Sequence, residues 1–198
     1  MNLSKLVNTL PLLIIGAIAY YGYNPETKPV SLLPQNNQFA AELPGEKFEE
    51  NPAANLPEYE VVAKSVHDGD TMRVRSRTGE VLKIRFACID APELKQELGQ
   101  ESRDTLRSYI NESDGKVRIN VVDTDRYGRS VAEVWTKTGL LQSRMVSSGM
   151  AFAYDAYSKN CPHWNAVKSN ERTAIESKLG VWNSPSFQKP WDWRKTNK

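Results

Sequence analysis

Histidine and cysteine are scarce in this sequence, which has two of each among 198 residues. Zinc sites in proteins are built from clusters of these side chains at close spacing. His67 and His163 stand far apart and have no ligand spacing around them. A zinc centre is therefore not expected.

A large excess of charge is also missing. The formal net charge of +2 is too small to indicate a polyanionic partner by itself. Its distribution is more informative, because residues 1–60 hold three basic and seven acidic side chains, whereas residues 61–198 hold 23 and 17. A basic body suits a polyanion such as nucleic acid, although a merely soluble surface would explain this balance almost as well.

Long apolar runs are confined to the N-terminus, where a mostly apolar stretch at residues 6–23 follows Lys5. This stretch is short for a hydrocarbon core of about 30 Å and suits a signal peptide. Three tyrosines near its end would instead suit an uncleaved membrane anchor at an interface. Residues 1–23 are thus predicted to be a signal peptide or an anchor, with a buried core helix as a less favoured alternative. Either of the first two makes the protein extracytoplasmic: secreted, periplasmic or membrane-anchored.

Residues 24–57 are rich in proline, asparagine, glutamine and glutamate and show no sustained periodicity. Such a composition does not bury enough apolar surface to fold, so we expect a disordered linker. One folded domain is expected over residues 58–184, followed by a C-terminal tail at 185–198. The overall apolar content of 39% suffices for a single core if the polar excess lies in the flanking segments.

The two cysteines, Cys88 and Cys161, fit an exported protein, in which one pair can form one disulfide. A bridge would tie an acidic strand end to the segment after Tyr157. The alternative is two separate thiols. We favour the bridge.

Alternating apolar and polar residues predict strands around residues 61–66, 71–75, 81–86, 117–121 and 131–135. Helical spacing predicts helices near residues 101–110, 140–148 and 164–179, the last ended by Gly180. This order indicates an α+β protein: a five-stranded β-barrel with about three helices, of the OB-fold kind. Such barrels often bind nucleic acid or sugars, but a fold alone does not establish a function.

Two carboxylates stand at the ends of different strands, Asp70 at the start of one and Asp90 at the end of another. If they meet, they repel each other unless a cation lies between them, and Ca²⁺ prefers oxygen ligands. Glu93 follows Pro92, whose fixed backbone can direct the carboxylate toward a water molecule as a general base or to orient it. The plain alternatives are a turn at residues 68–70 and an acid at a helix start for Glu93.

Two arginines suit a phosphate ligand. Arg85 lies on an otherwise apolar strand, where a charge is costly without an anionic partner. Arg129 closes a polar turn at residues 123–129. Attack on a phosphodiester builds negative charge on the phosphoryl oxygens. A guanidinium group can bind two such oxygens at once through two parallel N–H donors. We predict this role for both, with a structural salt bridge as the alternative for Arg85.

Four further side chains are candidates for substrate binding. Arg126 and Tyr127 would flank a terminal phosphate or sugar, and Tyr154 and Tyr157 would offer faces on which bases stack. Tyrosines are common on strands and loops, so purely structural roles stay open for them.

Taken together, these residues resemble the staphylococcal nuclease (thermonuclease) family. The resemblance covers about residues 59–182 and rests on residues 68–71, Arg85 with residues 90–93, and residues 125–129, 149–151 and 178–182, in this order. It implies an OB-fold, dependence on Ca²⁺, and hydrolysis of DNA and RNA to products that end in 3′-phosphate.

The resemblance also implies roles for single residues. Asp70 and Asp90 correspond to the calcium carboxylates, and Ala91 stands where the family often has a threonine that contributes its backbone carbonyl. Asp68 corresponds to an acid near the metal. Glu93 corresponds to the residue that activates or positions water.

The arginines and tyrosines are matched in the same way. Arg85 and Arg129 correspond to the arginines that stabilise the transition state. Arg126 and Tyr127 match the pair on the phosphate side, with Arg126 where lysine also occurs. Tyr154 and Tyr157 are offset from the tyrosines of the family.

The prediction is therefore a monomeric Ca²⁺-dependent phosphodiesterase that acts on DNA and RNA, with no protein partner implied and with possible membrane attachment through residues 6–23. Arg85→Ala or Glu93→Ala is expected to fold normally but to cleave barely at all. The rival functions are a non-catalytic nucleic-acid-binding module on the same barrel and an extracytoplasmic adhesion domain. All of this requires the acids and arginines to converge on one pocket.

Overall fold

The computed structural model describes residues 52–197. The expected signal peptide or anchor and the linker up to residue 51 lie outside the described residues. Within the described part of the chain, no helix has both the length and the apolar character needed to cross a membrane.

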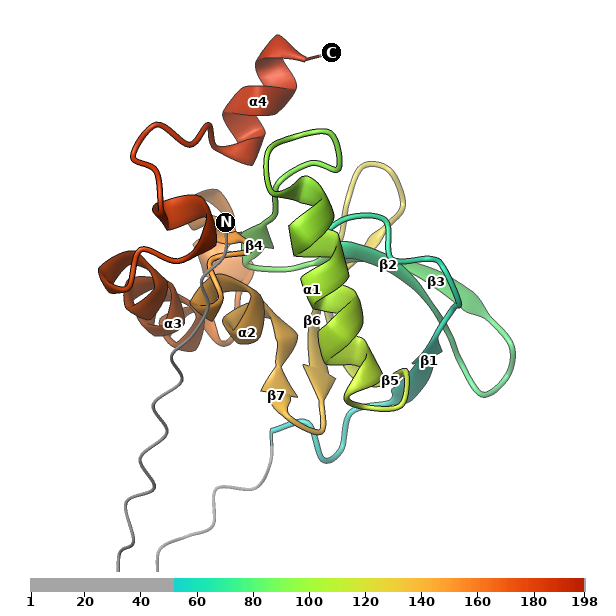
Figure 1. Cartoon of the computed structure of the whole chain (residues 1–198). Helices are drawn as coiled ribbons and strands as arrows, with labels where there is room; N and C mark the ends of the chain where they lie inside the picture. The colour runs from blue at the N-terminus through green and yellow to red at the C-terminus, as the bar shows by residue number, and fades with distance from the viewer. Residues whose placement is uncertain (1–51, 198) are drawn as a thin grey trace, which may run out of the picture. The chain divides into compact units, whose positions relative to one another are not determined.

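A barrel of five strands forms the centre of the domain (Figure 1). Short polar turns join β2 to β3 and β5 to β6, so these pairs are antiparallel hairpins. The barrel strands are β1 (Glu58–Val61), β2 (Thr71–Arg75), β3 (Val81–Phe86), β5 (Lys116–Thr124) and β6 (Ser130–Thr136).

The barrel closes between β3 and β6. The strands follow the order β3-β2-β1-β5-β6, and β3 also pairs with β6 in parallel, with Arg85 opposite Val131. Closure removes the free sheet edges that would otherwise invite association. The predicted fold class, a five-stranded barrel with helices, is confirmed.

Alternation along the strands explains the core. The buried, inward-pointing residues on β2 and β3 are Met72, Val74, Ile84 and Phe86. Arg73 and Lys83, each next to a buried residue on its strand, face solvent. Side chains on a strand alternate between its faces, so the same alternation sends Arg85 out of the apolar core. This position is what makes a charged residue tolerable on β3.

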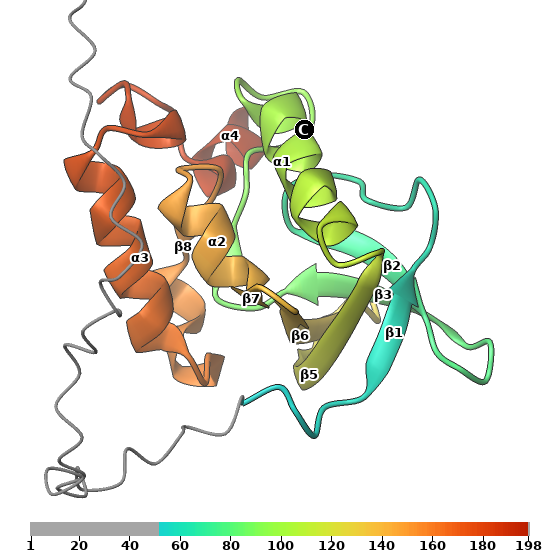
Figure 2. The same cartoon turned by 60° about the horizontal axis from the view of Figure 1, so that its bottom comes forward.

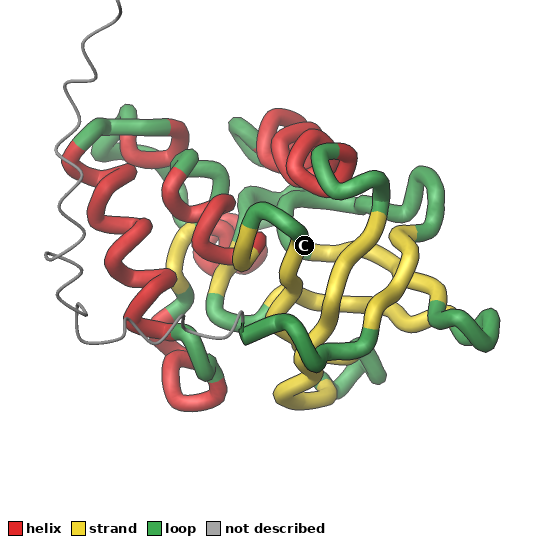
Figure 3. The backbone as a smooth tube through the Cα atoms, turned by 90° about the horizontal axis from the view of Figure 1, so that it is seen from below, coloured by secondary structure: helices red, strands yellow, loops and turns green. Residues whose placement is uncertain are grey.

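The remaining elements cover the barrel. Figures 2 and 3 show α2 and α3 side by side on one flank, while α1 lies along the barrel wall. The buried amide of Gln142 on α2 accepts a bond from Val134 N–H (3.1 Å) and donates one to the Ala132 carbonyl (2.8 Å), which fixes α2 to β6. The covering elements are α1 (Gly99–Asn111), β7 (Gly139–Leu140), α2 (Leu141–Ser147), α3 (Trp164–Glu176), α4 (Pro190–Thr196) and two 3-10 turns, Asp155–Asn160 and Gly180–Trp182.

A second, two-stranded sheet joins the barrel to the helices. It pairs β4 (Ile89–Asp90) with β8 (Phe152–Ala153), placing Asp90 opposite Phe152. Cys88, immediately before β4, forms a disulfide with Cys161. The bridge that the sequence analysis favoured over two separate thiols is present in the structure.

Two glycines let the helical layer pack closely. Gly149, with φ of 69°, approaches the backbone of Leu179 so closely that a Cβ atom would collide with its carbonyl. Gly180, with φ of 50°, faces Gly149 in the same way, and Val181 N–H donates to the Gly149 carbonyl (2.9 Å). Only glycine suits such positive φ angles at a backbone crossing.

Three expectations differ from the structure. The first strand is Glu58–Val61 rather than residues 61–66, because Glu60 and Val61 pair with β2 and the chain then turns. Residues 52–57, expected in the disordered linker, are ordered, with Ala53 buried and its carbonyl accepting a bond from Arg118 (3.1 Å). The tail contains the helix α4, which none of the strand and helix patterns indicated.

Candidate active site

Asp70 immediately precedes β2, and hydrogen bonds hold its carboxylate in place. Its carboxylate accepts bonds from the Ala91 N–H (2.7 Å) and the Thr71 hydroxyl (3.1 Å). Its own N–H donates to Asp68 (3.1 Å), which is buried beside it. Gly69 permits this turn, since a Cβ there would collide with the Ser102 hydroxyl. The segment 68–71 is therefore more than a plain turn, because it fixes a buried carboxylate.

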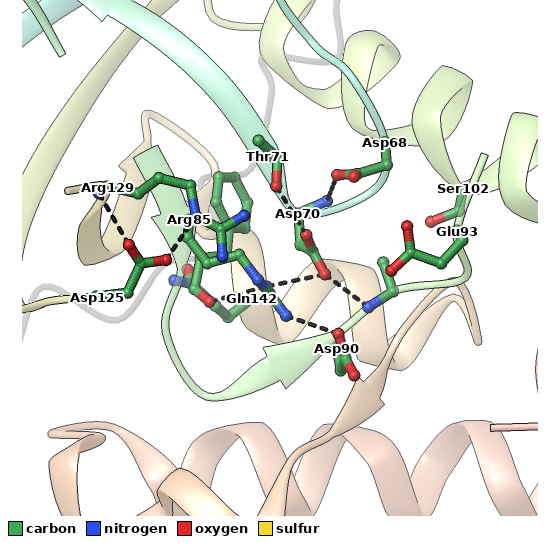
Figure 4. Close-up of polar contacts among 12 residues, drawn as sticks. Asp68, Asp70, Thr71, Arg85, Asp90, Glu93, Ser102, Asp125, Arg129 and Gln142 are labelled. Carbon is green, nitrogen blue, oxygen red and sulfur yellow. Dashed lines mark hydrogen bonds and ion pairs between the residues drawn. The ribbon is translucent and has the colours of Figure 1, made fainter. Parts of the chain in front are cut away.

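Arg85 joins Asp70 to Asp90. One guanidinium nitrogen lies 2.8 Å from Asp70 Oδ2, and the other lies 2.7 Å from Asp90 Oδ1. Figure 4 shows this guanidinium between the two carboxylates. The side chain of Asp90 is fully buried, and that of Arg85 is 15% exposed. The structure therefore contains the salt bridge that was the alternative interpretation of Arg85, and its role toward a phosphate stays a prediction.

A second arginine reaches the same acids from the C-terminal helix. Arg194 contacts both oxygens of Asp90, at 3.1 and 2.6 Å, and its Nη1 lies 2.7 Å from Glu93 Oε1. The Glu93 backbone is held by the side chain of Gln96, which accepts its N–H (3.2 Å). Asp70, Asp90 and Glu93 are therefore linked through two guanidinium groups into one network.

Burial dominates the electrostatics of the network. Burial raises the pKa of Asp70 to about 7; the positive charge of Arg85 opposes this shift, and the negative charge of Asp68 adds to it. Burial also raises the pKa of Asp90, against the opposing effects of Arg85 and Arg194. Burial would lower the pKa of Arg194, but its hydrogen bonds to Asp90 and Glu93 raise it overall. A further cation near these acids would favour their ionised forms and lower both pKa values.

Arg129 lies beside the network, on the turn between β5 and β6. Its Nε donates to Asp125 (2.6 Å), which also accepts the Arg129 and Tyr127 N–H groups at 2.9 Å. Burial would raise the pKa of Asp125, but these bonds lower it, so the turn carries a fixed charge pair. In Figure 4 Arg129 and Asp125 lie on the side of Arg85 away from Glu93. Among the described residues, the ion pair of Arg129 is with Asp125.

The other predicted binding residues fall into two groups. Arg126 donates to the Tyr127 hydroxyl (2.8 Å) on the exposed β5–β6 turn. Tyr154 and Tyr157 lie together, with ring centroids 5.2 Å apart, next to a pocket of about 290 Å³ that Tyr154 lines with Trp191 and two lysines. The structure thus places the two pairs on separate segments.

Two residues of the C-terminal segment were missed by the sequence analysis, Arg194 and Trp191. The ring of Trp191 stacks on Tyr154 at 4.9 Å, with 21° between their planes. The available signal was the sequence Pro190–Arg194, in which a proline that suits the first helical turn precedes two tryptophans and an arginine. Nothing in that pattern identifies Asp90 as the partner of Arg194.

The raised pKa of Asp70 predicts a pH-dependent stability in chelating buffer. Because the folded-state pKa is about 7 and the ordinary value is 3.8, the folded protein retains a proton that the unfolded chain has lost between these values. Stability therefore falls as pH rises from about 4 to about 7, by up to roughly 4 kcal/mol. Urea unfolding of the wild type and Asp70→Asn across this range should show a difference that shrinks toward low pH. A pH-independent difference would contradict the assignment.

Comparison with known proteins gives a consistent result. The family model described as "Staphylococcal nuclease homologue" matches residues 83–184. A "Micrococcal nuclease" of Shigella flexneri is 33% identical over 140 residues, which cover 66% of this chain and 78% of that protein. An "Uncharacterized endonuclease" of Escherichia coli O157:H7 is 36% identical over 131 residues, covering 65% and 80%.

A plant relative is also similar. A "Staphylococcal-like nuclease" of Arabidopsis thaliana is 30% identical over 149 residues, which cover 73% of this chain but only 44% of the plant protein. The chain therefore spans most of its bacterial relatives and less than half of this plant relative. The matched stretches include β3, β4 and the β5–β6 turn, which carry most of the candidate site.

Proposed function

This chain belongs to the staphylococcal nuclease family, as its motifs predicted, and we propose that it is an endonuclease that hydrolyses phosphodiester bonds of DNA and RNA with little sequence specificity. The observation that carries this proposal is one connected network: Asp70 and Asp90 meet at the guanidinium of Arg85, and Asp90 and Glu93 meet at that of Arg194. Arg129 lies on the turn that leads into β6, the strand that pairs with β3. The names of the three relatives described above all contain "nuclease" or "endonuclease". That agreement supports the reaction class.

The donor set fits a hard divalent cation. Two buried carboxylates, Asp70 and Asp90, are arranged across one guanidinium, and Asp70 has a raised pKa that an added cation would relieve. Oxygen ligands of this kind suit Ca²⁺. We propose that Asp70, Asp90 and the Ala91 carbonyl would hold Ca²⁺, with Asp68 fixing Asp70. When bound, the ion would neutralise a phosphate oxygen of the substrate.

Glu93 supplies the proton chemistry. Its side chain is 30% exposed, so water reaches it, and its backbone is anchored to Gln96. It would accept a proton from the attacking water or orient that water toward phosphorus.

The arginines would bind the phosphoryl group. Arg85 on β3 pairs with Val131 of β6, two residues after Arg129, and each arginine presents a planar, permanently charged fork of donors. They would stabilise the negative charge that develops on the phosphoryl oxygens. We propose that water attacks phosphorus and the P–O5′ bond breaks, which leaves a 3′-phosphate on one product and a 5′-hydroxyl on the other.

Substrate binding is proposed for two further groups. Arg126 and Tyr127 are exposed on the turn that carries Arg129, where they would contact a neighbouring phosphate or sugar. Tyr154 and Tyr157 would stack on bases, which makes binding tolerant of sequence. The basic excess of residues 61–198 would add attraction to the polyanion.

The cellular setting is also a proposal. The disulfide suits an oxidising compartment, and the apolar segment at residues 6–23 suits export or attachment to a membrane. We propose a monomeric extracytoplasmic enzyme, secreted, periplasmic or membrane-anchored, that acts on nucleic acid outside the cytoplasm.

The decisive experiment is digestion of plasmid DNA and of a long RNA by the purified protein. Both substrates should be degraded with Ca²⁺ and protected by a chelator, and product ends should be substrates for a 3′-phosphatase. Comparing the cleavage rates with Ca²⁺ alone and with Mg²⁺ alone then identifies the cation. Binding to DNA without cleavage under every cation condition would overturn the proposal in favour of a non-catalytic binding module.

A further inference from the structure

The segment of residues 188–197 is bound against the face that carries the acids. Figures 1 and 2 show α4 next to the loop between β4 and α1. The Gln188 carbonyl accepts a hydrogen bond from the side-chain amide of Gln96 on that loop. The ring centroids of Trp191 and of Phe152 on β8 are 5.7 Å apart. A seven-residue helix is not stable alone in water, so these contacts determine where α4 lies.

Arg194 occupies the acids that the proposed function needs. It binds Asp90 through both carboxylate oxygens and Glu93 through one, at 2.6 to 3.1 Å. Asp90 is a proposed cation ligand, and Glu93 is the proposed water-activating group. A guanidinium in this position neutralises the first and hydrogen-bonds the second, so neither is free for its role.

Trp191 occupies a second part of the same face. Its ring lies nearly parallel to Tyr154 at 4.9 Å, the stacked geometry that a base would adopt on this tyrosine. The Lys189 ammonium also lies over the Trp191 ring, 5.2 Å from its centroid. One short helix thus places an aromatic ring on the base-stacking tyrosine and a cation on the acids.

These two contacts are incompatible with the loaded site. A divalent cation at Asp90 and a guanidinium on the same carboxylate repel each other, and a base cannot stack where Trp191 already lies. When two groups compete for one site, each weakens the binding of the other by the same factor. A bound cation or substrate must therefore displace α4, and a docked α4 must weaken the binding of both.

We propose that α4 is an autoinhibitory cap, in which Arg194 competes with the divalent cation and Trp191 competes with a nucleobase. The cap holds the site closed until cation and nucleic acid together displace it. This inference rests on the proposed function for the roles of Asp90, Glu93 and Tyr154. It gives the C-terminal segment a regulatory role in that reaction.

The test compares Arg194→Ala with Lys195→Ala in the full chain. Lys195 is the neighbouring residue on the same helix, pairs with Asp192 at 2.8 Å and is exposed, so its loss removes an equal charge without freeing the acids. Calorimetric titration with Ca²⁺ should show tighter binding to Arg194→Ala by on the order of tenfold. Lys195→Ala should bind like the wild type. Trp191→Ala should bind a phosphorothioate oligonucleotide more tightly than the wild type.

Hydrogen exchange provides a readout that is independent of cleavage. Amides of residues 190–197 should lose protection when Ca²⁺ and the phosphorothioate oligonucleotide are added to the wild type. Unchanged Ca²⁺ affinity in Arg194→Ala, or increased protection of α4 in the complex, would overturn the cap. Reduced cleavage by Arg194→Ala at saturating Ca²⁺ would also overturn it, because Arg194 would then act on the substrate.

Failure of the proposed function would look different. A wild-type protein that binds Ca²⁺ but cleaves nothing would refute the nuclease proposal, while the difference in Ca²⁺ affinity between Arg194→Ala and Lys195→Ala would still support or refute the competition at Asp90.

Discussion

Replacing Glu93 with glutamine should lower the rate of phosphodiester cleavage at saturating Ca²⁺ by about 10²–10⁴-fold. Glutamine has the same shape and still accepts a hydrogen bond from Arg194, but it does not take a proton from water. The side chain is 30% exposed, and its backbone bond to Gln96 is unaffected by the change. The free energy of unfolding should therefore stay near that of the wild type, and circular dichroism during urea titration would check it.

A matched control lies on the same loop. Glu97 is exposed and has no contact with the acids, so Glu97→Gln removes an equal charge four residues away and should cleave at the wild-type rate. Near wild-type cleavage by Glu93→Gln would remove Glu93 from the proposed mechanism. A parallel loss in both variants would point to the net charge of the loop instead.

Arg85→Ala should lower both the rate of cleavage and the stability of the fold, whereas the sequence analysis expected a loss of cleavage alone. If Arg85 binds the phosphoryl group as proposed, its loss should lower turnover by about 10²–10³-fold. The sequence-based expectation that this variant folds normally is at odds with the contacts, because Arg85 is the partner of both Asp70 and Asp90 in the buried network. Removing it in chelating buffer should cost about 3–5 kcal/mol of stability, and added Ca²⁺ should restore part of that loss.

The barrel and most of its site were predictable because local pattern and position decided them. Alternation in β2 and β3 is regular, so the strands and the outward direction of Arg85 follow from the sequence. The position of Asp70 at the start of one strand and of Asp90 at the end of another brought them to the same end of the barrel. The resemblance to a known family then assigned the roles that periodicity does not.

The rest was not predictable from local pattern. Arg194 meets Asp90 across a separation of 104 residues, and no short-range rule pairs an arginine in a polar tail with a particular carboxylate. Gln142 reads as an ordinary helix residue, yet its amide satisfies the backbone of β6. In both cases tertiary contacts give the residue its role, so the role becomes visible only once the elements are packed.

Reduction of the Cys88–Cys161 disulfide should lower the free energy of unfolding by about 4 kcal/mol, since the bridge closes a loop with a sequence separation of 73 residues. The bridge restricts the unfolded chain and also holds β4 beside the segment that follows β8. Tyr154 N–H donates to the Cys88 carbonyl (2.8 Å), so the bridge supports the backbone on which Asp90 and Tyr154 are carried. Urea titrations with and without a thiol reductant would measure the change.

The double variant Cys88→Ser, Cys161→Ser is the control, because it should match the reduced wild type and should not respond to reductant.

Glu133 lies within 4.8 Å of both sulfur positions, and its carboxylate binds His163 Nδ1 at 2.9 Å. A reduced protein could therefore gather a soft metal ion on the two thiolates and Glu133, so the titrations need a chelator. If the oxidised and reduced proteins unfold at the same urea concentration under these conditions, the bridge contributes no stability. The ordering of β4 and β8 would then rest on their backbone pairing and on the buried Glu171 carboxylate that accepts the Ala153 N–H (2.7 Å).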